Sequence, residues 1–88
     1  MSQSAGGPGP LAIELARERA HLVMAERDIA AGEARVRAQA ALIATLRDRG
    51  QDTMGAARLL ETLEETLAQW RCHRDLIAAR IAYLEGRA

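Results

Sequence analysis

One apolar stripe in the C-terminal half of the chain constrains its fold more than any other feature. Large apolar side chains recur there at intervals of three, four or seven residues, which places them on a single face of an α-helix. Arg74 fills the one polar position of the stripe. A stripe of this length is unstable in water, so another part of the chain has to cover it. Its apolar members are Leu60, Leu63, Leu67, Trp70, Ile77, Ile81 and Leu84.

Residues 11–49 have the composition of the covering element, because they are rich in Ala, Leu, Glu and Arg, which favour helix. Every seventh residue from Leu15 to Ile43 is large and apolar, and the row between is mostly small or polar. The small Gly32 lowers helix propensity by about 1 kcal/mol, so we expect a packing gain to offset it. The two rows are Leu15, Leu22, Ile29, Val36, Ile43 and Leu11, Glu18, Ala25, Gly32, Gln39, Leu46.

Residues 50–53, between these two segments, are predicted to form a tight turn. Gly50 suits the left-handed position that follows a helix, and Asp52 or Thr53 can cap the next helix. A connection this short makes the helices antiparallel neighbours. We therefore predict an all-α, coiled-coil-like helical hairpin over residues 11–86, with helices at 11–49 and 54–85 and a turn at 50–53. Residues 1–10, rich in Gly and Pro, should form a disordered tail.

Heptad alignment predicts the register of the hairpin. If Ile43 faces Leu60, then Gly32 faces Trp70, and the smallest side chain of the seam meets the largest. We expect Gly32 to make room for Trp70.

Two polar residues lie within the predicted seam. Arg74 should run its stem along the core and pair with Asp28 or Glu33, because a buried charge needs a partner. The alternative is that Arg74 binds an acidic group of another protein. Gln39 is expected to specify register or oligomeric state, as polar core residues do in coiled coils.

A second apolar strip lies outside the seam, and a hairpin of this size has little core of its own. We predict that two chains bury this strip in a two-fold homodimer, forming a four-helix bundle. The competing prediction is a docking surface for a different protein partner. The strip comprises Ala16, Val23, Met24, Ala30, Ala31, Ala38, Ala44, Leu59, Leu76, Ala78 and Tyr83.

Charge and cysteine content bear on partners and location. The chain has 12 basic residues, all Arg, 12 acidic residues and a net charge of zero, which argues against nucleic acid and anionic membranes as partners. Cys72 is the single cysteine, and we find neither a signal peptide nor a membrane-spanning apolar run, so we expect a cytoplasmic protein.

Candidates for chemistry are few. Cys72 and His73 point about 100° apart on a helix, and His21 lies far from them in the predicted register. The acidic residues read as a solvated face rather than as a paired acid and base. We expect no metal site, no cofactor and no enzymatic activity.

Several short motifs carry a resemblance. Ile29-Ala30-Ala31-Gly32-Glu33, the Gly50-x-Asp52-Thr53 turn, Leu59-Leu60 and His73-Arg74-Asp75 resemble a set of short proteobacterial proteins, of the kind found in rhizobial-type genomes. The match covers about residues 25–77, and its most specific part is the turn with the Leu-Leu that follows. The resemblance implies a helical hairpin and supplies no function, because that set is uncharacterised in function.

The function expected from the sequence is a small, self-associating helical module for protein interaction or structure. The alternative is a nucleic-acid-binding four-helix dimer similar to Rop, which uses an outer helix face. Its binding patch would be formed by Arg17, Arg27, Arg35, Arg37 and Arg47.

Overall fold

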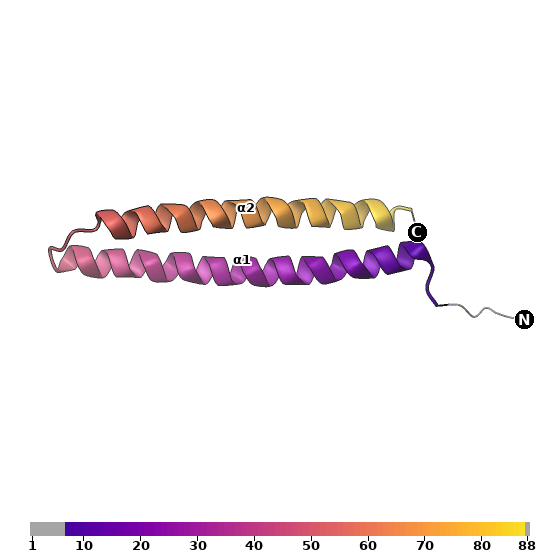
Figure 1. Cartoon of the computed structure of the whole chain (residues 1–88), viewed down its shortest axis with the longest axis horizontal. Coiled ribbons are helices and arrows are strands. Elements are labelled where there is room, and N and C mark those ends of the chain that lie inside the picture. Colours follow the sequence, from indigo (N-terminus) through magenta and orange to yellow (C-terminus); the bar gives the residue numbers. More distant parts are fainter. Residues whose placement is uncertain (1–6, 88) are drawn as a thin grey trace, which may run out of the picture.

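The computed structural model describes residues 7–87, which form two long α-helices packed side by side in opposite directions (Figure 1). Helix α1 spans Pro10–Asp48 and helix α2 spans Met54–Glu85. At 1.5 Å per residue they are about 58 and 48 Å long. The predicted all-α hairpin is confirmed, and the start of α1 and the end of α2 lie at the end opposite the turn.

Helix α1 begins at Pro10 and ends at Asp48, one residue earlier at each end than the predicted 11–49. Proline suits the first helical position because its φ angle is already helical and the missing N–H has no partner there. The Ile13 amide donates to the Gly9 carbonyl at 3.1 Å and closes the first turn. Residues 1–6 of the predicted tail lie outside the described residues. Helix α2 has the predicted bounds.

The turn is built from two backbone hydrogen bonds and one glycine. Gly50 has φ +67°, and its amide donates to the Arg47 carbonyl, while the Gln51 amide donates to the Leu46 carbonyl. This pair of bonds is the Schellman arrangement, which satisfies the last carbonyls of a helix and reverses the chain. Asp52 Oδ1 accepts a hydrogen bond from the Met54 amide at 3.0 Å, so Asp52 rather than Thr53 supplies the side-chain cap.

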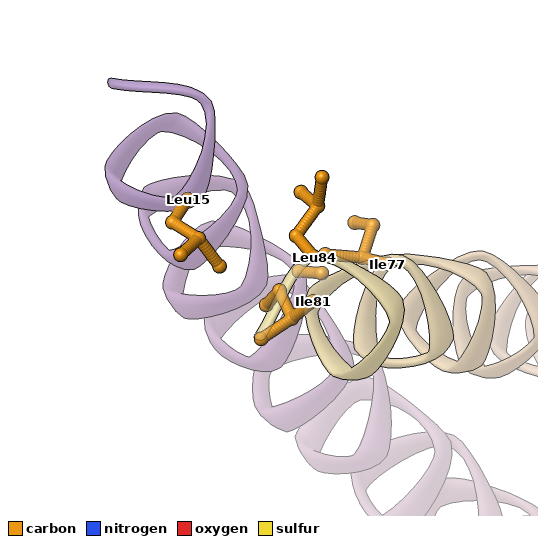
Figure 2. Close-up of a cluster of buried hydrophobic side chains, with 5 residues drawn as sticks. Leu15, Ile77, Ile81 and Leu84 are labelled. Carbon is orange, nitrogen blue, oxygen red and sulfur yellow. The ribbon is translucent and has the colours of Figure 1, made fainter. Parts of the chain in front are cut away.

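The core is a single seam along the length of the hairpin. The buried and half-buried positions of α1 include both predicted heptad rows, with Glu14, Asp28 and Glu33 in addition. Those of α2 include the predicted stripe except Trp70, with Ala56 in addition. Burial is densest at the open end, where Leu15 of α1 lies near Ile77, Ile81 and Leu84 of α2 (Figure 2). The buried side chains are Leu15, Ala25, Ile29, Ile43, Leu67, Ile77, Ile81 and Leu84.

The predicted register is wrong by about one helical turn. A Cβ atom placed on Gly32 would lie 3.2 Å from Leu67 Cδ1, and no Trp70 atom lies within 4 Å of it. Gly32 therefore makes room for Leu67. In an antiparallel pair, one step forward along α1 corresponds to one step back along α2. Counted in this way from the Gly32–Leu67 contact, Met54 lies level with Thr45 rather than with the end of α1.

The turn explains the shift. Because the Gln51 amide reaches back to the Leu46 carbonyl, the chain doubles back beside the last turn of α1 before α2 begins. The same count places Trp70 level with Ile29, which is buried and fills the seam there. Trp70 is left 37% exposed, with its ring edge-on to His73 at 6.2 Å between centroids.

Substitution of Gly50 by Ala should lower the free energy of unfolding by about 1–2 kcal/mol, because a Cβ atom is strained at positive φ. Gly55→Ala is the matched control: Gly55 lies in the first turn of α2 with open space around it, so that change should be neutral or stabilising by up to about 1 kcal/mol. Urea denaturation at one chain concentration measures both. Equal effects would contradict the account of the turn.

Substitution of Gly32 by Leu should overpack the seam and cost about 1–3 kcal/mol. If Leu67 is the neighbour, a Gly32→Leu, Leu67→Ala double variant should cost less than the sum of the two single changes, because the large and small side chains have exchanged places. Gly32→Leu, Trp70→Ala should show no such compensation. Compensation by Trp70→Ala and not by Leu67→Ala would instead support the register predicted from the sequence, in which Gly32 faces Trp70.

Candidate interaction surface

Most of the large apolar side chains that remain in solvent lie on one side of the hairpin, which we name the apolar side. Within residues 7–87, nine large apolar residues are exposed, and of these only Val23 and Met54 fall elsewhere. The members of the apolar side are Ile13, Met24, Leu42, Leu59, Trp70, Leu76 and Tyr83.

Heptad spacing shows why these residues share a side. Glu14 and Arg80 form an ion pair of 2.9 Å between the helices, so both face the same way across the seam. Leu42 lies four heptads from Glu14, and Leu59 lies three heptads from Arg80. Because burial keeps a seven-residue repeat along the whole seam, residues separated by whole heptads keep the same side.

A hollow of about 700 Å³ lies at the open end of this side. Tyr83, Ile13, Glu14, Arg17 and Arg80 line it together, which places Tyr83 and Ile13 beside the ion pair. Arg87 also lines it, with its guanidinium carbon 5.5 Å from the centre of the Tyr83 ring. Leu76 lies one heptad from Tyr83, and Met24 lies one heptad from Arg17.

A second hollow, of about 380 Å³, lies half-way along α2 and is lined by Thr66, Gln69, Trp70 and His73. Thr66 and His73 are one and two heptads from Leu59, so this hollow opens on the apolar side as well. The apolar side therefore runs from Tyr83 at the open end, through Trp70, to Leu42 and Leu59 near the turn.

The opposite side of the seam is charged. Arg19 pairs with Glu85 at 2.8 Å, and Arg71 pairs with Glu33 at 3.0 Å, each bond joining the two helices. Val23 belongs to this side, since it lies four residues after Arg19 on the same helix face. The paired side chains are about half exposed, and such pairs contribute about 0–1 kcal/mol each.

Arg74 does not pair with Asp28 or Glu33, so that prediction is wrong. Its Nε donates to Asp75 Oδ1 at 2.7 Å, and Glu33 is held by Arg71 instead. Counted from the Gly32–Leu67 contact, Arg74 lies level with the small Ala25. Ala25 leaves room for the arginine stem in the seam while the guanidinium turns outward. Its side chain is 33% exposed, so the charge is solvated.

Gln39 bridges the two helices. Its Nε2 donates to the Ala56 carbonyl at 2.9 Å in a partly buried position near the turn. The bond can form only if the first turn of α2 lies beside Gln39, so it favours one register over neighbouring ones. This contact agrees with the register part of the prediction for Gln39.

The residues considered for chemistry are far apart or solvated. Cys72 is exposed on the outer face of α2, and His21 lies 3.7 Å from Glu18 on α1. Among residues 7–87, no three His, Cys, Asp or Glu side chains are grouped as metal ligands.

The arginines of the proposed nucleic-acid patch do not form one surface. By the seven-residue repeat of the seam, Arg17 and Arg35 lie on the apolar side, Arg37 and Arg47 lie on the charged side, and Arg27 lies between them on the outer face of α1. All five are exposed. A nucleic-acid groove requires such charges along one face, so the geometry weighs against the Rop-like alternative.

The second apolar strip predicted from the sequence divides between the two sides. Met24, Leu59, Leu76 and Tyr83 belong to the apolar side, whereas Val23 lies on the charged side. Sequence reasoning missed Leu42, and it placed Trp70 in the seam. Leu42 lies on the same heptad row as Glu14, and this spacing can be read from the sequence. The side of the seam on which that row lies is known only from the Glu14–Arg80 ion pair.

Comparison of the chain with known proteins finds no matching protein-family model, no matching curated protein and no matching solved structure. Within residues 7–87, neither helix has a stretch long and apolar enough to cross a membrane.

Replacement of Arg74 by Leu should leave the free energy of unfolding unchanged or raise it, because the change removes only a solvated ion pair and extends the apolar stripe. Ile77→Ala, one position of the same stripe further on, is the control and should cost about 2–5 kcal/mol. Double-mutant cycles of Arg74 with Asp28 and with Glu33 should show no coupling. A loss for Arg74→Leu as large as that for Ile77→Ala would contradict this assignment.

Proposed function

We propose that this chain is a small helical interaction module that works by self-association through its apolar side, without a catalytic step. The observation that carries the proposal is the distribution of apolar side chains. The hairpin leaves no side chain of residues 7–87 completely buried, yet exposes seven large apolar residues along one side.

Two further features support this role. Exposed apolar groups on a soluble monomer are usually scattered, whereas a continuous apolar strip marks an interaction surface. The charged groups that join the helices are concentrated opposite this strip, apart from the Glu14–Arg80 pair at its end. A hairpin that pairs through its apolar side would keep most of its ion pairs in water and add a second apolar layer to its core.

The resemblance to short proteobacterial hairpin proteins concerns the fold alone and supplies no function. A different protein occupying the apolar side remains the competing form of the same proposal. It differs in one measurable respect, which is that the chain alone would then be a folded monomer.

Sedimentation equilibrium over a wide concentration range tests the proposal. The wild-type chain should approach the mass of a dimer, and Leu76→Glu should shift it toward monomer, because a carboxylate on the apolar side would be desolvated in the dimer. Val23→Glu is the matched control on the charged side and should leave the dimer intact.

A wild-type chain that stays monomeric and unfolds cooperatively would overturn self-association and favour a different protein as partner. If Leu76→Glu and Val23→Glu weakened the dimer equally, the assignment of the interface to the apolar side would be overturned.

A further inference from the structure

We infer that two copies of the chain pair through the apolar side about a two-fold axis parallel to the helices, with both turns at the same end. Helix α1 of each copy then lies on helix α2 of the other. This arrangement rests on the proposed self-association and adds its geometry, since several other dimers would also bury apolar groups.

The argument begins with residues that lie at the same level on the two helices. Counted from the Gly32–Leu67 contact, Leu42 and Leu59 differ in level by two residues, or about 3 Å. Met24 and Leu76 differ by one residue, or about 1.5 Å. Each pair contributes one apolar residue from α1 and one from α2, and both residues lie on the apolar side.

A two-fold rotation about the long axis preserves level and exchanges the two helices. It therefore places Leu42 of one copy against the partner's Leu59, and Met24 against the partner's Leu76. Each contact occurs twice in the dimer, so the four leucines form an apolar cluster near the turns. The surface is complementary to itself in this orientation, as a two-fold interface requires.

Charged residues favour the same arrangement. Asp28 lies two heptads from Glu14, and His73 lines the second hollow, so both face the apolar side. Their levels differ by about 3 Å, so each Asp28 would meet the partner's His73.

The alternative two-fold axis, perpendicular to the helices, places the turn of one copy at the open end of the other. Asp28 lies one residue from the midpoint of α1, so full overlap would bring the two Asp28 carboxylates together. Leu42 would then lie beside Ala16 and Arg17 instead of a leucine. Like charges at the centre and unmatched apolar groups at the ends disfavour this dimer.

The area available is sufficient for a stable pair. The overlap is set by the 32 residues of α2, about 48 Å long, and by two helices of about 10 Å diameter each, which gives roughly 1,000 Å² per chain. Stable interfaces bury about 800 Å² on each partner. A second copy therefore fits the whole apolar side without a further partner.

Disulfide trapping between chains with one cysteine each tests the arrangement. In a Cys72→Ser background, the Leu42→Cys chain is mixed with the Leu59→Cys chain and oxidised, and the disulfide-linked product is identified by intact mass. A single cysteine per chain excludes bonds within one hairpin. The mixed dimer should form in at least about tenfold higher yield than either product of one variant with itself, because paired sites hold the thiols at high effective concentration.

Two other mixtures serve as controls. Leu59→Cys mixed with Tyr83→Cys should give the dominant product only if the two-fold axis is perpendicular to the helices. Ala30 lies on the charged side, so the Ala30→Cys chain should give little product. Met24→Cys with Leu76→Cys repeats the test if a leucine variant does not fold.

The outcomes separate this inference from the proposed function. Dominant Leu59–Tyr83 or Ala30 products in a chain that sediments as a dimer would overturn the arrangement and leave self-association standing. A chain that sediments as a monomer and gives no dominant product would overturn both.

Discussion

Two helices can cover each other along one stripe only, and this limit shapes every other property of the hairpin. The seam buries eight side chains to between 2% and 8% exposure, and none of them completely. Apolar residues outside the seam have no place within the chain, so they gather on its surface. The cross-helix ion pairs Arg19–Glu85 and Glu33–Arg71 occupy one edge of the seam, and the exposed apolar groups share the other edge with the Glu14–Arg80 pair. The exposed apolar side is thus a consequence of a core that two helices cannot complete.

The turn decides which residues reach that surface. Because Gly50 and Gln51 reverse the chain beside the last turn of α1, helix α2 starts level with Thr45. This offset places Leu67 against Gly32 and Trp70 at the level of the bulky Ile29, so the indole is displaced outward toward His73. The Gln39 bond to the Ala56 carbonyl holds the same offset near the turn. The register therefore also affects the apolar side, since it sets which residue of α1 lies level with Trp70.

The sequence was sufficient for the fold and for most of the seam, because heptad spacing and turn chemistry are local properties. It predicted most of the buried positions of both helices and the left-handed Gly50, and it named Asp52 as one of two candidate caps. It failed where axial offset mattered, at Gly32 and Trp70, because spacing alone does not show how far the chain doubles back. The Arg74 prediction failed for a related reason: the neighbouring Asp75 was closer than any acid across the seam. The apolar side was predicted only in part, since Leu42 could be assigned to it only after the sides were distinguished by ion pairs.

The central claim is that the apolar side becomes buried when the chain self-associates, and Trp70 reports this directly, because it is the only tryptophan. Its ring is partly exposed in the single hairpin and lies in the middle of the apolar side. The decisive measurement is the Trp70 emission maximum during dilution, with helix content followed by circular dichroism on the same samples. The account predicts a shift to longer wavelength as the dimer dissociates. A constant emission maximum, from concentrated solution down to a dilution at which the helices melt, would contradict it.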